Sequence, residues 1–182
     1  MKGMNIEILP AAVSCLSALE SLTIMYSRLT SIPEEIGELT NLHTLVLSGN
    51  RVLQKLPPSL SRLSSLAQLD LSNCPIRSLP EGTGQLGGLR ELTLSCSHLT
   101  ELPASITQLS RLEALKADMC LDLASAPRSM GNLSSLRELD LSHCYPLTET
   151  KETLPRSMQH LPRDLGSLSQ LRELHVEWAE FF

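Results

Sequence analysis

The stretch LTNLHTLVLSGN at residues 39–50 decides the fold of this chain. Its apolar residues follow the pattern LxxLxxLxL, which ends in Leu45 and Leu47 with one residue between them. Leucines that alternate with other side chains are typical of a short strand that buries one face. The stretch therefore predicts a strand, and the sequence on either side of it shows what surrounds that strand.

The same block occurs seven times along the chain. The blocks begin at Leu16, Leu39, Leu63, Leu86, Leu109, Leu133 and Leu168, so successive starts are 23, 24, 23, 23, 24 and 35 residues apart. A proline precedes every block in the same phase, at Pro10, Pro33, Pro57, Pro80, Pro103, Pro127 and Pro162. Proline cannot continue a β-ladder, and the apolar residues three apart that follow it suit one turn of α or 3₁₀ helix. One strand and one helical return per unit predict an α/β repeat, stacked into a curved solenoid with a parallel sheet on its concave face.

The composition agrees with stacked, near-identical units. Of the 182 residues 39 are leucine, whereas the aromatic residues are one Trp, two Tyr and two Phe. A core made almost wholly of one aliphatic side chain suits cavities that repeat from unit to unit. The leucine content therefore reports the architecture and says little about activity.

The full unit, LxxLxxLxLSxNxLxxLPxxIGx, resembles the leucine-rich repeat family over almost the whole chain. Its LPxxIGxL portion is similar to the Ras-group repeats of intracellular plant and animal proteins. The LSxC variant at 71–74 and 141–144 is similar to repeats of plant disease-resistance receptors. The resemblance implies one right-handed solenoid over 1–182, with seven strands and an N-terminal half repeat. It also implies that small polar side chains hydrogen-bond the backbone of neighbouring units at one loop position, held here by Ser27, Asn50, Cys74, Ser97, Cys120 and Cys144.

Two segments depart from the repeat. Residues 147–161 lengthen the last interval, and this insertion is either a neutral loop or a partner-binding feature. Residues 177–182 hold Trp178, Phe181 and Phe182, three of the five aromatic residues. Because an open solenoid end exposes apolar core, we expect this tail either to cap the last unit or to dock onto another domain or chain.

Composition and charge exclude several classes of protein. No apolar run approaches the roughly 20 residues that span a bilayer, and no apolar block of a secretory signal follows residues 1–5, so we expect no membrane association. The net charge of −5 argues against a nucleic acid partner. The five cysteines form no CxxC pair, which favours a reducing compartment and predicts the cytoplasm, with the nucleus as the alternative.

The candidate working surface is the concave face, to which the side chains between the buried leucines point. Seven of these side chains are acidic and one is a lysine, and the acids accumulate toward the C-terminal units. An acidic, serine-lined surface with Tyr26, Met119 and Trp178 as apolar anchors favours a protein partner that presents a basic segment. The candidate partner-binding residues are Tyr26, Asp70, Asn73, Glu91, Lys116, Asp118, Met119, Glu138, Asp140, His143, His175, Glu177 and Trp178.

Arginines flank this face. Arg90, Arg137 and Arg172 each immediately precede a glutamate of the concave face. We expect them to pair with acids locally or across neighbouring units, which would reduce the negative field and add little stability.

Neither catalysis nor metal binding is expected from the remaining polar residues. Acidic side chains stand near His143 and His175, but no nucleophile lies at a suitable spacing and an open solenoid offers no closed pocket. The Cys96-x-His98 pair and the His143-Cys144 pair fall on units that are not adjacent. The sequence therefore predicts no enzyme, no metal site and no cofactor.

These observations favour a protein–protein interaction module or scaffold. The resemblance implies a place in intracellular signalling or in plant-type immune recognition. The alternative is a ligand-sensing or autoinhibitory segment of a larger receptor or enzyme, whose catalytic part lies outside this chain.

Overall fold

The computed structural model describes residues 5–124, 126–144, 161–162 and 164–177. Along this part of the chain, one short helix and one short strand alternate without exception. The strands are β1 (Ser21–Thr23), β2 (Thr44–Val46), β3 (Gln68–Asp70), β4 (Glu91–Thr93), β5 (Ala114–Lys116), β6 (Glu138–Asp140) and β7 (Glu173–His175). The helices are η1 (Ala11–Cys15), η2 (Glu34–Glu38), η3 (Pro58–Arg62), η4 (Glu81–Gln85), η5 (Ala104–Gln108), η6 (Met130–Asn132) and η7 (Leu165–Ser167).

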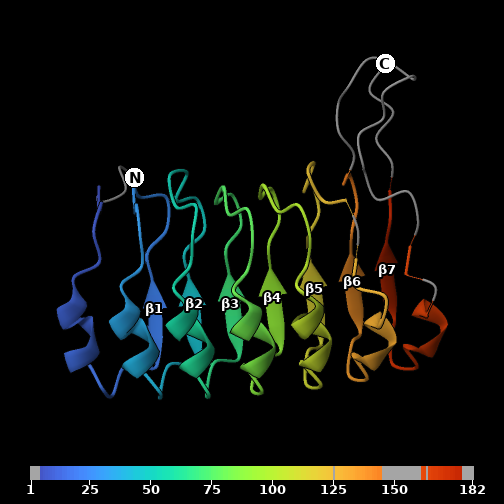
Figure 1. Ribbon diagram of the computed structural model, residues 1–182, viewed down its shortest axis with the longest axis horizontal. Helices are drawn as coiled ribbons and strands as arrows, with labels where there is room; N and C mark the ends of the chain where they lie inside the picture. The colour runs from blue at the N-terminus through green and yellow to red at the C-terminus, as the bar shows by residue number, and fades with distance from the viewer. Residues whose placement is uncertain (1–4, 125, 145–160, 163, 178–182) are drawn as a thin grey trace, which may run out of the picture.

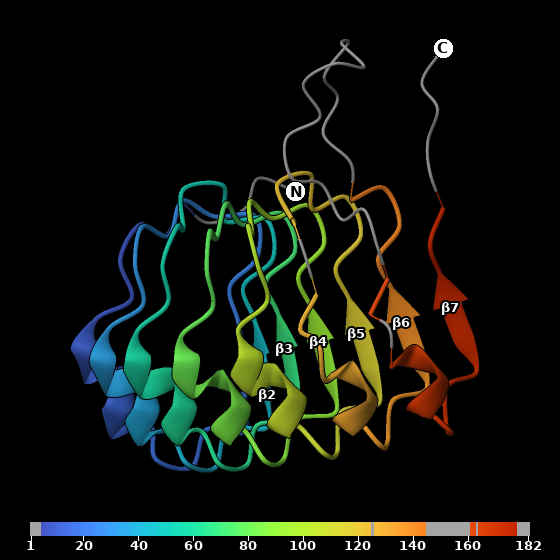
Figure 2. The same ribbon diagram turned by 45° about the vertical axis from the view of Figure 1, so that its right-hand side comes forward.

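The strands form one parallel sheet in the order β1-β2-β3-β4-β5-β6-β7, so neighbours in sequence are neighbours in space. The central leucine of each strand lies opposite the central leucine of the next, from Leu22 and Leu45 through to Leu139 and Leu174. Figure 1 shows the strands side by side, and Figure 2 shows the helices as a separate row that covers one face of the sheet. The predicted fold class, a leucine-rich solenoid with a parallel sheet, is confirmed.

The helical returns are all 3₁₀ helices in the described residues, and the sequence explains why they are short. A proline is the N-cap residue of each of η1 to η5. Glycine then lets the returns of adjacent units pack closely: a Cβ on Gly37 would lie 2.5 Å from the carbonyl oxygen of Ser59, and Gly84 faces Ser105 in the same way. At the junctions of η2 with η3 and of η4 with η5, the close approach therefore depends on a position without a side chain.

Leucine fills the space between the sheet and the helices. Leu45, Leu69 and Leu92 expose none of their surface, whereas Leu16 and Leu174 near the two ends are 54% and 42% exposed. Each core leucine is covered by its counterparts in the units before and after it. The end units consequently bury their leucines less completely than the central ones.

The loop position that the resemblance assigned to a small polar side chain has the expected hydrogen bonds. The Asn50 amide donates to the carbonyl oxygens of Ile24 at 2.7 Å and Leu47 at 2.6 Å. The Cys74 thiol donates to the Leu47 carbonyl oxygen at 3.2 Å, and the thiols of Cys120 and Cys144 donate to carbonyl oxygens in the same way. These buried thiols are therefore structural donors.

Other features predicted from the sequence fall outside the described residues. The insertion at 147–161 does so except for Leu161, which is 40% exposed, and the tail does so after Glu177. Across the residues that the structure does describe, no helix has the length and apolar character needed to cross a membrane.

Candidate functional site

The candidate site is the sheet face, by which we mean the side chains that point away from the core on β1–β7 and on the turn after each strand. The register keeps equivalent residues opposite one another, so these side chains form four rows that run across the strands. The first row runs from Ser21 to Glu173, the second from Thr23 to His175, and the third from Met25 to Glu177. The fourth row starts at Tyr26, and its last described member is His143.

The structure brings the predicted residues together on this face. All of the candidate residues lie in the four rows except Trp178, which lies outside the described residues. Glu91 and Glu138 belong to the first row, Asp70, Lys116, Asp140 and His175 to the second, Asp118 and Glu177 to the third, and Tyr26, Asn73, Met119 and His143 to the fourth.

Two carboxylates face each other across neighbouring strands. Glu138 on β6 and Glu173 on β7 are paired residues in the sheet. Like charges directly opposite one another destabilise a sheet. Lys116 Nζ lies 2.8 Å from Glu138 Oε1, and this hydrogen bond raises the lysine pKa above its usual range. On the other side, His175 Nε2 lies 3.6 Å from Glu173 Oε2. Because an imidazole is charged only when it is protonated, the two carboxylates share one permanent cation, Lys116.

Neutral donors hold the aspartates of the face in place. Asp70 Oδ1 accepts hydrogen bonds from the Ser72 amide at 2.9 Å and the Ser72 hydroxyl at 2.5 Å, and Asp140 Oδ1 accepts one from a backbone amide at 2.9 Å. Asp118 accepts a hydrogen bond from the Ser95 hydroxyl of the preceding unit. Since these donors carry no charge, they orient the carboxylates and leave the negative potential of the face intact.

The fourth row has an unusual backbone conformation. Five of its residues have a positive φ although they carry side chains, with values of 49° at Tyr26, 56° at Asn73, 57° at Cys96, 55° at Met119 and 56° at His143. This left-handed region is unfavourable for residues with a Cβ and is found often at ligand-binding positions. Each amide of the row from Tyr26 on, such as that of Cys96, donates to a carbonyl oxygen of the next unit at 2.8 to 2.9 Å. The ladder of hydrogen bonds thus continues past the strands and fixes the row.

Tyr26 is the most exposed large apolar residue of the face, with 72% of its surface accessible. Its ring lies directly over Gly49, the next member of the row: a Cβ on Gly49 would lie 2.5 Å from Tyr26 Cδ1. Gly49 also has a positive φ of 78°, so glycine suits this position in two respects. One face of the Tyr26 ring therefore packs against the backbone at Gly49, and the other face is open to a partner.

A row of charged residues, Arg90, Glu113, Arg137 and Arg172, borders the first row. Arg90 Nη1 lies 2.5 Å from Glu113 Oε1, and Arg137 Nη1 lies 2.9 Å from Glu113 Oε2. One glutamate thus bridges two arginines from the units before and after it. The expected pairing across units is confirmed for Arg90 and Arg137, and it is Glu113 rather than the glutamate beside each arginine that pairs with them. For Arg172 the expected pairing stays a prediction.

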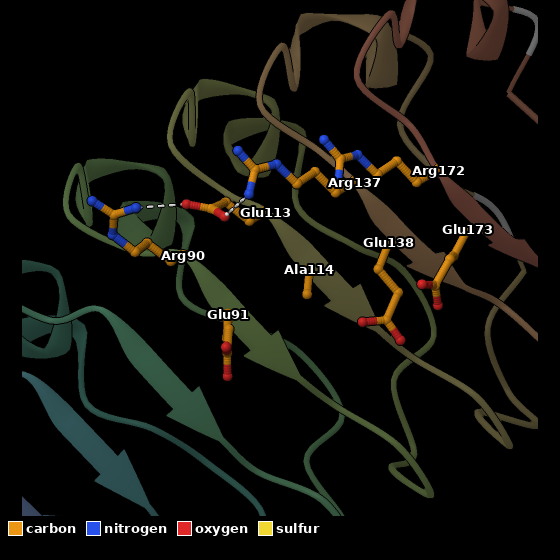
Figure 3. A pocket seen from close by; sticks show the side chains of 8 residues that line it. All are labelled: Arg90, Glu91, Glu113, Ala114, Arg137, Glu138, Arg172 and Glu173. Carbon is orange, nitrogen blue, oxygen red and sulfur yellow. Dashed lines mark hydrogen bonds and ion pairs between the residues drawn. The ribbon is translucent and has the colours of Figure 1, made fainter.

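A shallow hollow of about 420 Å³ lies between these charges. Figure 3 shows the arginines and Glu113 along one side and the first-row glutamates along the other. The hollow is lined by Arg90, Glu91, Glu113, Ala114, Arg137, Glu138, Arg172 and Glu173. Its lining is almost wholly charged, which suits an extended polar segment better than an apolar small molecule.

One group of side chains here has the donors for a cation. The ligand atoms of Glu138, Glu173 and His175 all lie within 4.8 Å of one another. Because Lys116 already pairs with Glu138, this group is part of the acidic surface rather than a separate site.

Sequence reasoning missed two features of the site. The role of Glu113 was visible in principle, since the 23- and 24-residue intervals place it in one row with Arg90 and Arg137. The left-handed conformation of the fourth row had a weaker signal in the sequence, because Tyr26, Cys96 and Met119 are not residue types that favour it.

Comparisons with known proteins give the family context. A family model described as "Leucine-rich repeat region" matches residues 60–181, and a second, described as "Leucine rich repeat", matches residues 17–76. No curated protein matches the chain.

Solved structures share the fold over 74% to 95% of this chain. A leucine-rich repeat protein of Leptospira interrogans has a TM-score of 0.76 at 27% identity, over 95% of this chain and 42% of that one. The ectodomain of the Arabidopsis thaliana receptor kinase GASSHO1/SCHENGEN3, in complex with CASPARIAN STRIP INTEGRITY FACTOR 2, has a TM-score of 0.74 at 27% identity, over 94% of this chain and 20% of that one. The Arabidopsis receptor kinase HAESA, in complex with the peptide hormone IDA and the co-receptor SERK1, has a TM-score of 0.60 at 28% identity, over 74% of this chain and 27% of that one. The chain thus spans less than half the length of each.

Proposed function

Because the chain belongs to the leucine-rich repeat family, we propose that it is a binding module whose sheet face holds an extended basic segment of a partner protein. The fold commonly mediates protein–protein interaction or ligand binding, and such domains are generally non-catalytic. The partner chemistry rests on the charges of the sheet face. The HAESA structure, a complex with a peptide hormone, supports a peptide-like ligand.

The observation that carries the proposal is the pairing of Glu138 with Glu173. Two carboxylates placed opposite each other cost stability, and a single lysine at Glu138 compensates only one of them. A lysine or arginine side chain of a partner would remove this repulsion when it binds. The aspartates held in place by serine donors would extend the same interaction along the sheet face.

Tyr26 supplies the apolar contact at the opposite end of the face. Its ring is supported from below by Gly49 and is 72% exposed. Exposed tyrosines that are already held in one position make strong contacts in interfaces, since little side-chain entropy is lost on binding. A segment that runs across the strands would therefore meet an aromatic anchor first and carboxylates afterwards.

The experiment measures peptide binding by fluorescence anisotropy. Lysine- and arginine-rich peptides and glutamate-rich peptides of equal length are titrated with the chain at low and at physiological salt. We expect tighter binding of the basic peptides and weaker binding as salt rises. The double variant Glu138→Gln with Glu173→Gln should weaken binding about fivefold or more.

A matched control removes two carboxylates from the other side of the molecule. The double variant Glu35→Gln with Glu38→Gln, on η2, changes the net charge of the chain by the same amount. Its affinity for the basic peptides should stay within about twofold of that of the parent. Equal affinity for basic and acidic peptides, or equal losses in both double variants, would contradict the proposal.

We further propose that the module acts in intracellular signalling or in plant-type immune recognition, in the cytoplasm or the nucleus. The similarity of its repeats to Ras-group and disease-resistance repeats supports this, as do the free cysteines of the described chain. The second candidate is a ligand-sensing or autoinhibitory part of a larger receptor. It is favoured by the fact that the chain corresponds to only 20% of the GASSHO1/SCHENGEN3 chain and 27% of the HAESA chain.

A further inference from the structure

The charged hollow has two sides of opposite charge at its C-terminal end. Arg137 and Arg172 stand next to each other along one side, since the Arg172 amide donates to the Arg137 carbonyl oxygen at 2.8 Å. Glu138 and Glu173 follow them in sequence and are paired residues of β6 and β7. All four side chains line the hollow of about 420 Å³. We call the two arginines the basic wall of the hollow and the two glutamates its acidic wall.

The two walls do not neutralise each other. Figure 3 shows the arginine side chains extended along their row toward Glu113, whereas the carboxylates of Glu138 and Glu173 point away from both of them. These carboxylates contact the second row instead, with Lys116 Nζ 2.8 Å from Glu138 Oε1 and His175 Nε2 3.6 Å from Glu173 Oε2. Opposite charges that line one hollow without touching each other are complementary to a ligand that carries both charges.

Arg172 is the arginine of this hollow whose charge is not balanced. Arg90 and Arg137 share Glu113, at 2.5 Å and 2.9 Å. No carboxylate of the part of the chain that the structure describes forms an ion pair with Arg172, which is exposed. An exposed arginine can be hydrated, so the missing partner does not define a site by itself. Its position in a hollow opposite the acidic wall does.

The geometry of an extended chain says which ligand fits between the walls. Successive side chains of such a chain point to opposite sides. A partner segment that runs along the hollow therefore turns one side chain toward the acidic wall and the next toward the basic wall. A run of basic residues would place every second cation against the arginines, where like charges repel.

We propose that the partner segment carries an acidic residue directly beside a basic one, and that Arg172 binds the carboxylate of this acidic residue. The inference rests on the proposed function and sharpens it, because it names the short sequence that the site selects. That sequence is a mixed pair such as lysine followed by glutamate. The lysine reaches Glu138 and Glu173, and the glutamate reaches Arg172.

The charges around Arg172 favour a carboxylate over a phosphate. A phosphorylated side chain carries nearly two negative charges at neutral pH. One unpaired guanidinium balances one negative charge, and the acidic wall would repel the surplus. A carboxylate also matches the planar guanidinium group, since the two can form a pair of parallel hydrogen bonds.

The test titrates the full chain against three labelled peptides of equal length and equal lysine content at physiological salt. The peptides differ only in the residue beside the central lysine, which is glutamate, glutamine or phosphoserine. We expect the glutamate peptide to bind about fivefold more tightly than the glutamine peptide, and the phosphoserine peptide to bind no more tightly than the glutamine peptide. An acidic surface without the basic wall gives the reverse order for glutamate and glutamine, because glutamate lowers the positive charge of the peptide.

Arg172→Gln should abolish this preference, so that the glutamate and glutamine peptides bind within about 1.5-fold of each other. The matched control is Arg62→Gln, which removes an exposed arginine of η3, in the row of helices. It changes the net charge of the chain by the same amount and should keep the fivefold preference.

The outcomes separate this inference from the proposed function. Equal binding of the glutamate and glutamine peptides, tighter binding of the phosphoserine peptide, or a preference that survives Arg172→Gln would overturn the inference. The proposed function would still stand if basic peptides bind more tightly than acidic ones. If basic and acidic peptides bind equally, both are wrong.

Discussion

Cys74 shows how a single buried side chain links stability to pH. Its thiol exposes none of its surface, and burial raises its pKa from 9.0 to about 11. Between these values the unfolded thiol loses its proton while the folded thiol keeps it. The contribution of Cys74 to the free energy of unfolding is therefore complete below about pH 9 and is lost as the pH rises through 11.

The prediction compares the parent with Cys74→Ser in urea unfolding at pH 8 and pH 10.5. Serine stands at the equivalent positions 27 and 97, so the variant should fold and keep a donor toward the Leu47 carbonyl oxygen. The unfolding free energy of the parent should fall more steeply with pH than that of the variant. Other titrating groups are common to both proteins, so identical slopes would contradict the assignment to Cys74.

At this scale the sequence predicted roles well where they follow from position in the repeat. Asn50 and Cys74 occupy one loop position, and both make the expected hydrogen bonds to backbone carbonyl oxygens. The positive φ of Tyr26 and Met119 could not be predicted, because neither residue type prefers it. It follows from the closure of each turn against the next unit, which is a tertiary constraint.

At the scale of the element, the close packing of 3₁₀ helices depends on glycine. Gly84 in η4 faces the backbone of Ser105 in η5, where a Cβ would overlap the carbonyl oxygen. Gly84→Ala should therefore lower the free energy of unfolding by about 2 to 4 kcal/mol. A Cβ on Gly87 would lie 4.0 Å from its nearest neighbour, the carbonyl oxygen of Gln85. Gly87→Ala should therefore change the free energy of unfolding by no more than about 0.5 kcal/mol.

Urea unfolding monitored by circular dichroism measures both glycine variants. The two substitutions add the same methyl group three residues apart, so they share any general effect of alanine. If the two variants lose similar amounts of unfolding free energy, η4 and η5 can move apart at little cost, and the explanation by close packing is wrong.

Sheet pairing is the part of the fold that the sequence predicted most completely. The period aligns the central leucines of neighbouring units, and the sheet register follows it. The 35-residue interval keeps the same register, since Glu138 pairs with Glu173 at the equivalent position of the next unit. The choice of 3₁₀ over α-helix was left open, because a single turn carries too few residues for the apolar pattern to separate the two.

At the scale of the whole molecule, stability is distributed along the solenoid rather than concentrated in one core. Leu92 in the central strand β4 is fully buried, whereas Leu174 in β7 is 42% exposed. Leu92→Ala should lower the free energy of unfolding by about 3 kcal/mol, since it leaves a cavity between two neighbouring units. Leu174→Ala should cost less than about 1 kcal/mol.

Chemical unfolding of the two leucine variants separates a central position from a terminal one with the same substitution. Nearly equal losses would mean that the end unit is as well buried as the centre. That result would contradict the exposure found at Leu174.

The sequence predicted which residues lie on the sheet face, but it did not predict which of their side chains contact one another. The acidity of the sheet face follows from counting residues between the leucines, and the structure places those residues together. The bridging role of Glu113, and the contact between Cys96 and Met119, depend on side-chain conformations that no repeat pattern encodes. The roles of Trp178 and of the insertion at 147–161 remain predictions from the sequence.

The strand order has a mechanical consequence. Each strand is hydrogen-bonded only to the strands of adjacent units, so tension applied to the two ends of the chain passes through every junction, and a terminal unit, which has a single neighbour, is held least firmly. Under such a load the units would detach one after another from an end, and each would release about 80 Å of extended chain. Such a molecule would lengthen in steps under load rather than unfold in a single event.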